Sequence, residues 1–219
     1  MSDALTLSFQ VAAAATVIAG LLGVLVAQLL ATHRFPGRDL LDVGITAPMV
    51  LPPTVLGYYL LVLIGRSSRI GHAFESLTGS SIVFTKTGAV IAAVVSGFPI
   101  VVKSARAALE AVDPDLLRAA RTLGAAPIRV FLTVHLPLAY RGIVAATVLA
   151  FAKSLGDFGV TLMIAGNIPG RTQTASLAIY DALQAQRDGD ALTMVLVLTG
   201  TAVLSLYVVS KLTGGADLR

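Results

Sequence analysis

Long stretches without a charged side chain dominate the hydrophobic pattern of this sequence. No charge occurs between Asp3 and His33, and shorter charge-free runs cover 43–65, 87–102 and 191–210. A helix needs about 20 apolar residues to cross a ~30 Å hydrocarbon core. The pattern therefore predicts five membrane-spanning helices, and their approximate bounds are 5–31, 43–65, 84–106, 142–164 and 191–211.

Composition agrees with a chain surrounded largely by lipid. Apolar residues make up 56% of the 219 residues and charged residues only 13%, against about 25% charged residues in soluble domains. We expect an all-α integral membrane protein with a single domain over 1–219. The chain has no cysteine, which excludes disulfides and thiolate metal sites. Its net charge of +4 is distributed by membrane side, so we expect no nucleic-acid binding.

The distribution of Lys and Arg predicts the orientation, because cytoplasmic connections are enriched in these residues. With the N-terminus outside, the inner segments carry Arg34, Arg38, Lys103, Arg106, Arg118, Arg121, Arg129, Arg141, Lys211 and Arg219. The outer segments carry fewer: Arg66, Arg69, Lys86, Arg171 and Arg187. We therefore expect a multi-pass protein of the cell (inner) membrane with its N-terminus outside and its C-terminus in the cytoplasm. The largest cytoplasmic connection then runs from about 103 to 141.

This connection contains a short helix whose two ends are marked in the sequence. Asp113 is a good N-cap, and Pro114 suits the first helical position. Gly124 suits the left-handed residue just after a helix end. We expect a second short helix from Pro127 through Val134 that stops before Pro137. Such an element is shaped to insert into a groove of a partner, and an ordinary interfacial amphipathic hairpin is the alternative.

The spacing Ala119-Ala120-x3-Gly124-x9-Val134-x-Leu136-Pro137 resembles the EAA loop of ABC importer permeases, E-A-A-x3-G-x9-I-x-L-P. In that family the loop forms a coupling helix that sits in a cleft of the cytoplasmic ATPase subunit. One departure is Arg118, which replaces the family's Glu and reverses its charge. The resemblance implies a coupling loop over about 113–137, with these candidate residues: Asp113, Pro114, Leu117, Arg118, Ala119, Ala120, Arg121, Leu123, Gly124, Val134, Leu136 and Pro137.

Two further segments resemble the molybdate/sulfate/tungstate permease group of this family. Residues 51–61 are similar to its second span, and 150–159 are similar to its A-F-A-R-x-L-G-E-F-G motif, with Lys for Arg and Asp for Glu. The resemblance implies a fold like that of a type I ABC importer permease with five transmembrane helices. The short chain favours molybdate, while tungstate and sulfate stay open.

The same resemblance implies what the chain assembles with. The expected partners are a second copy of the chain, two cytoplasmic ABC ATPase subunits, an extracytoplasmic oxyanion-binding protein and the lipid bilayer. No cofactor is expected on this chain, because the partner ATPase uses the ATP and Mg²⁺. The sequence itself contains no phosphate-binding glycine loop and no catalytic or metal-binding constellation, so we expect a transport subunit and not an enzyme.

Two charged residues interrupt the fourth predicted span. Lys153 and Asp157 are four residues apart and can pair on one helical face. Ionisable residues within a span usually face the bundle interior or a water-filled cavity. In a functional role, Lys153 assists a dianionic oxyanion along the pathway or the pair locks a gate. In a structural role, the ion pair ties the fourth span to a neighbouring helix. A channel or membrane enzyme that uses Lys153 and Asp157 is the alternative of a different class.

Prolines interrupt the second predicted span in a similar way. Broken helices commonly line transporter pathways, so Pro52 and Pro53 join Lys153 and Asp157 as pathway or gate candidates. His33, His72 and His135 have no ligand spacing, and we interpret them as interfacial residues at the membrane boundaries.

Overall fold

The computed structural model describes residues 2–213, and every regular element within that range is a helix. Four helices are long and apolar enough to cross a membrane: α1 (Ser2–Thr32), α5 (Lys86–Glu110), the continuous helix from Pro127 to Leu155 and α11 (Asp188–Thr213). A fifth crossing is possible where α2 (Arg38–Val50) and α3 (Pro53–Ile64) form one bent pair. The all-helical membrane fold is as predicted. Arg219, counted above among the cytoplasmic charges, lies outside the described residues.

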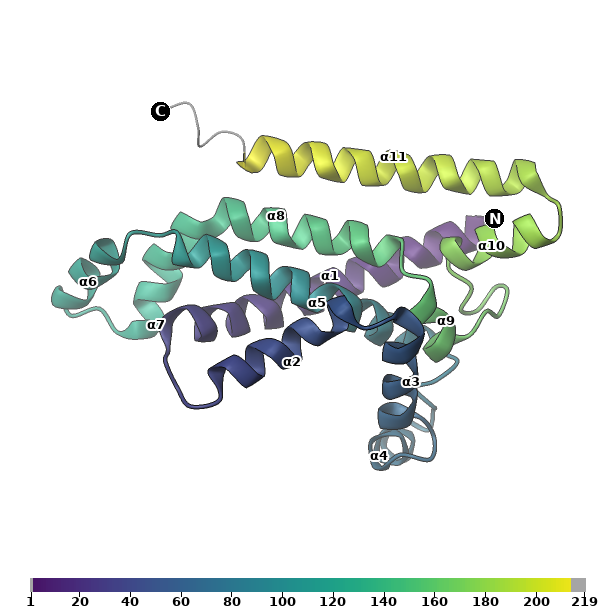
Figure 1. Cartoon of the computed structure of the whole chain (residues 1–219), viewed down its shortest axis with the longest axis horizontal. Helices are drawn as coiled ribbons and strands as arrows, with labels where there is room; N and C mark the ends of the chain where they lie inside the picture. Colours follow the sequence, from purple (N-terminus) through teal and green to yellow (C-terminus); the bar gives the residue numbers. More distant parts are fainter. Residues whose placement is uncertain (1, 214–219) are drawn as a thin grey trace.

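The long helices run along one axis, and short helices lie at both ends of the bundle (Figure 1). At one end are α6 (Pro114–Thr122) and α7 (Pro127–Val130), beside the end of α1. The N-terminus and α10 (Ala175–Gln184) lie at the other end, while α3 and α4 (Arg69–Thr78) project to the side. The expected cytoplasmic loop and the expected external terminus are therefore at opposite ends of the molecule.

The second predicted span, 43–65, is wrong as a single helix. Helix α2 ends at Val50, α3 begins at Pro53, and their axes differ by 120°. Leu51 and Pro52 are extended between them, with ψ angles of 138° and 137°. Two consecutive prolines explain the break, because proline has no N–H to donate and disfavours the helical conformation in the residue before it.

The fourth predicted span, 142–164, is wrong at both ends. It begins much earlier, because α7, a π-helical turn η1 (Phe131–His135) and α8 (Leu136–Leu155) form one continuous helix. It ends at Leu155, and after a short break the chain forms the separate helix α9 (Gly159–Ala165). The third span is also displaced: α5 covers 86–110 where 84–106 was expected, because the Thr85 hydroxyl caps its first turn by accepting from the N–H of Gly88.

Helices α1, α5 and α8 form the centre of the bundle through small residues. Their mutual contacts bury these alanines: Ala12, Ala15, Ala19 and Ala27 of α1, Ala89, Ala93 and Ala105 of α5, and Ala146 and Ala150 of α8. At Gly142 the approach of α8 to α5 is so close that an added Cβ would lie 2.4 Å from the Cβ of Ala108. Small residues are the usual means of close helix packing in membranes.

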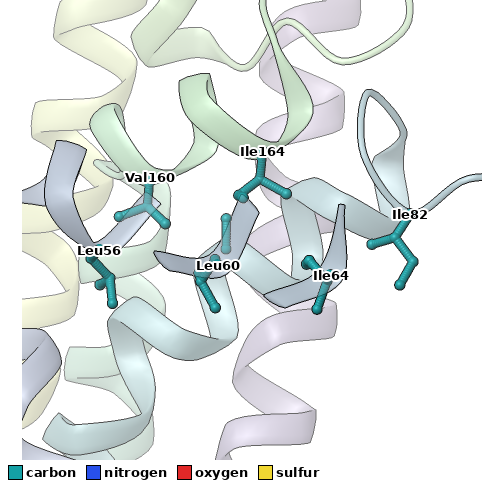
Figure 2. Packing of buried hydrophobic residues seen from close by; sticks show 7 residues of the cluster. Leu56, Leu60, Ile64, Ile82, Val160 and Ile164 are labelled. Carbon is teal, nitrogen blue, oxygen red and sulfur yellow. The ribbon is translucent and has the colours of Figure 1, made fainter. Parts of the chain in front are cut away.

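A second cluster holds α3 against α9 and α5. Leu56, Leu60 and Ile64 of α3 pack with Val160 and Ile164 of α9, as Figure 2 shows. Ile82, from the loop before α5, completes one side of the cluster. This packing fixes the α8–α9 break beside the α2–α3 break, although about 100 residues separate them in the sequence.

Two helices are barely covered by the rest of the chain. Helix α2 has no buried residue, and α11 buries only Ala191, Met194 and Ser205. Val50 of α2 has 81% of its surface exposed. Apolar faces of this extent need lipid or a protein partner to cover them.

Candidate functional site

The loop helix α6 forms as the sequence predicts. The Asp113 carboxylate accepts a hydrogen bond of 2.8 Å from the N–H of Asp115, and Pro114 occupies the first helical position. Gly124 has φ +82°, the left-handed conformation expected just after the helix. These three residues define the helix through local chemistry alone.

Helix α6 is exposed at the end of the bundle. It has no buried residue, and its main contacts are with α7 and η1 (Figure 1). Leu123 is 88% exposed and Ile128 is 64% exposed, which gives the hairpin an apolar tip. Arg118 forms an ion pair of 2.7 Å with Asp115 one turn earlier. Of the coupling-loop candidates up to Gly124, most are exposed: Asp113, Pro114, Arg118, Ala119, Arg121, Leu123 and Gly124; Leu117 and Ala120 are half-buried.

The helix expected to stop before Pro137 instead continues through it. The backbone N–H of Leu136 donates to the carbonyl of Phe131, five residues earlier, in the π-helical turn. This wider turn accommodates Pro137, which cannot donate and would clash in a regular α-helix. Val134, Leu136 and Pro137 therefore lie on the stem of the loop and not on its exposed hairpin.

His135 is buried, so its interpretation as an interfacial residue is wrong. Only 3% of its surface is exposed. Its Nε2 lies 3.0 Å from the carbonyl oxygen of Leu109 near the end of α5. Its ring packs edge-on against Phe131, with 6.5 Å between the ring centroids.

A cavity of about 200 Å³ lies where both broken helices meet. It contains three of the four predicted pathway residues, Pro53, Lys153 and Asp157, whereas Pro52 does not line it. The remaining lining is mainly apolar: Pro48, Met49, Leu51, Leu56, Ser96, Ile100 and Val160. The structure thus brings together residues from α2, α3, α5, the helix end of α8 and α9.

The predicted pairing of Lys153 with Asp157 is wrong in this structure. Asp157 is 5% exposed, and its Oδ1 accepts from the hydroxyl of Ser96 at 3.1 Å. Its Oδ2 accepts from the N–H and the hydroxyl of Thr161 at 3.0 and 2.6 Å. The four-residue spacing fails because the helix ends at Leu155, so Asp157 caps the first turn of α9 instead.

Lys153 therefore lies in the cavity without Asp157 as its partner. Its side chain is exposed, and within residues 2–213 it takes part in no ion pair. The cavity therefore contains a carboxylate fixed by three donors and an ammonium group available for another interaction.

Sequence reasoning missed a cluster of charges near the loop end of the bundle. Asp42 of α2 pairs with Lys103 and Arg106 of α5 at 2.8 and 3.3 Å. Arg106 also pairs with Glu110 at 2.8 Å, and Glu110 lies 3.7 Å from Arg38. The sequence did contain one signal: Asp42 precedes the charge-free run 43–65, and the oppositely charged Lys103 follows the run 87–102. The cluster links α2 to α5 immediately before the loop.

A membrane bundle of this topology, with an exposed helical hairpin at one end, has the architecture of an ABC importer transmembrane subunit. In agreement, the fold is similar to a chain of a bacterial alginate ABC transporter solved in complex with an alginate pentasaccharide-bound periplasmic protein. The TM-score is 0.73 at 14% identity, covering 98% of this chain and 77% of that one.

Residues 19–213 match the model of the family described as binding-protein-dependent transport system inner membrane component, and the chain belongs to that family. It is 43% identical to the molybdenum transport system permease protein ModB of Escherichia coli (strain K12), over 94% of this chain and 90% of the relative. ModB of Haemophilus influenzae is 45% identical over 83% of this chain and 80% of its own length. The protein is thus a multi-pass subunit of a binding-protein-dependent transport system and not an enzyme.

Proposed function

We propose that this chain is the permease of a molybdate importer, in which two copies form the pathway and two ATPase subunits bind on the cytoplasmic side. The exposed hairpin of α6 is the observation that carries the proposal, because it presents an apolar tip that no described element of the chain covers. The substrate follows from the two relatives, both named molybdenum permeases. ATP and Mg²⁺ would be used by the ATPase subunits, with no cofactor on this chain.

The proposed orientation has the N-terminus outside and the C-terminus in the cytoplasm. It puts α6, Arg118, Arg121 and the ion-pair cluster on the cytoplasmic side, as the excess of basic residues favours. ATP-driven movement of the ATPases would then displace α6 and switch the cavity between the two sides by rigid-body movement.

Within the pathway, we propose that Lys153 contacts the oxyanion. An ammonium group without an ion-pair partner among the described residues, beside an apolar wall with broken helices, can attract a dianion, whereas the Asp157 oxygens are already occupied by donors. Pro52 and Pro53 would maintain the break between α2 and α3 that lies beside the cavity. Tungstate is nearly the same size as molybdate, so the binding protein would be the subunit that discriminates between them.

A substitution at Gly124 tests the docking proposal, and the chain offers a matched control. Gly124 and Gly79 both have positive φ, +82° and +69°, and neither has an atom within 4 Å of an added Cβ. Gly124→Trp and Gly79→Trp therefore impose similar backbone strain at different places in the molecule. We expect only Gly124→Trp to abolish binding of the ATPase subunit in detergent. Equal binding by both variants would refute docking through α6.

The pathway proposal is tested by uptake into proteoliposomes that contain the permease, its ATPase and its binding protein. We expect Lys153→Ala to lower molybdate uptake at least several-fold without weakening ATPase binding, and Lys153→Arg to retain uptake. Unchanged uptake by Lys153→Ala would leave Lys153 without a transport role. Uptake without ATP would favour a channel. Faster uptake of tungstate or sulfate than of molybdate would identify that anion as the substrate instead.

A further inference from the structure

Both stems of the coupling loop meet at His135. One stem is the end of α5 at Glu110, and the other is the helix that starts at Pro127. His135 belongs to the second stem, and its Nε2 lies 3.0 Å from the carbonyl oxygen of Leu109 on the first. A carbonyl can only accept, so Nε2 carries the hydrogen and donates it.

This contact has no equivalent nearby in the part of the chain that the structure describes. Between α5 and the helix of residues 127–155, the other side-chain hydrogen bond in that part is the one from Ser154 to Ala93, at the far end of both helices. Apart from His135, the stems are joined by an apolar cluster that includes Leu109 and Phe131. Such packing resists separation but is less directional than a hydrogen bond.

Movement of α6 must pass through these stems. Its main contacts are with α7 and η1, so a force on α6 acts first on the helix that continues into α8. Helix α5 receives that force through the short link 111–113, through its packing against α8 and through His135. The buried hydrogen bond from His135 to Leu109 holds the end of α5 directly to η1.

We propose that His135 is a positioning residue for transport: it joins α5 to η1, so that displacement of α6 moves α5 and α8 together. This inference rests on the proposed docking of an ATPase at α6. Without the hydrogen bond, α8 would still follow α6, and apolar packing alone would join η1 to α5, so α5, which carries Ser96 in the cavity wall, would follow less closely. Less molybdate would then be transported for each ATP hydrolysed.

The test compares His135→Phe with His135→Gln in proteoliposomes that contain the permease, its ATPase and its binding protein. Phenylalanine keeps a ring against Phe131 but cannot donate, whereas the glutamine amide can donate to Leu109. We expect His135→Phe to lower the molybdate transported per ATP hydrolysed by about five-fold, the scale of one hydrogen bond. His135→Gln should stay within about two-fold of the unmodified chain on the same scale.

Phe131→Leu is the control, because it disturbs the same cluster without removing the donor. We expect it to lower the melting temperature but leave the transport-to-ATP ratio unchanged. If His135→Phe is not recovered folded, His135→Met makes the same comparison with a side chain that fills irregular gaps. An unchanged ratio in the phenylalanine or methionine variant, or an equal loss in Phe131→Leu, would overturn the proposal. Failure of the unmodified chain to bind the ATPase would instead contradict docking at α6.

Discussion

Replacing Asp157 separates two explanations for a carboxylate within the membrane. In the structure its oxygens accept three hydrogen bonds, from Ser96 and from the backbone and hydroxyl of Thr161. An ion pair with Lys153 would make the negative charge essential. Hydrogen bonding instead makes the acceptor oxygens essential, and asparagine retains one of them.

The expected loss can be worked out from these contacts. Neutral hydrogen bonds between membrane helices contribute about 0.6 kcal/mol on average, and bonds to an ionised group are roughly twice as strong. Asp157→Ala should therefore lower the free energy of unfolding by about 3.6 kcal/mol. In Asp157→Asn the new amide could accept both bonds from Thr161 and donate to the hydroxyl of Ser96, so this variant should lose only about half as much.

Thermal unfolding of the purified chain in detergent measures this difference. At about 2–4 °C per kcal/mol for a chain of this size, Asp157→Ala should lower the melting temperature by roughly 7–14 °C and Asp157→Asn by roughly 4–7 °C. Lys153→Met should leave the melting temperature nearly unchanged, because Lys153 has no ion pair within residues 2–213 to lose. Equal losses in the alanine and asparagine variants, together with a similar loss in Lys153→Met, would refute the hydrogen-bond explanation in favour of an ion pair.

Two further changes test the packing and the charge cluster. Gly142→Ala should lower the free energy of unfolding by about 1–3 kcal/mol, because the new Cβ would lie 2.4 Å from that of Ala108; Gly189→Ala, which has open space, is the control in the same melting assay. Asp42→Asn removes the charge facing two basic residues of α5 and should cost about 1 kcal/mol. That cost should shrink when melting is repeated at about 1 M salt, since salt screens partly exposed charges; a cost independent of salt would contradict an electrostatic role.

Elements that depend on neighbouring residues could be predicted from the sequence. Helix α6 is the clearest example, because its cap at Asp113, its first residue Pro114 and its left-handed Gly124 each act within a few residues. Apolar length was also sufficient for α1 and α11, whose bounds lie within three residues of the prediction, but not for the helix that ends at Leu155.

Features that depend on distant residues could not be predicted. Asp157 looked like the partner of Lys153 because both lie in one apolar run, but Ser96, which bonds it, is 61 residues away in the sequence. The ion pair of Asp42 with Lys103 spans the same separation. The cavity was only partly foreseen for this reason: its residues were named, but their arrangement depends on how α3 and α9 pack.

The π-helical turn of residues 131–135 holds one extra residue in the stem of the loop without changing the direction in which α6 faces. A π-helical turn contains one residue more than the α-helical turn it replaces, and each residue of an α-helix turns the chain by about 100°. Deleting that residue would therefore leave α6 and α7 at nearly the same angle around the axis of α8, whereas a deletion in the α-helical part of the stem would rotate them by about 100°. The direction of the proposed docking surface therefore depends on the number of α-helical residues in its stem, and the π-helical turn is a place where the stem can lose one residue and keep that direction.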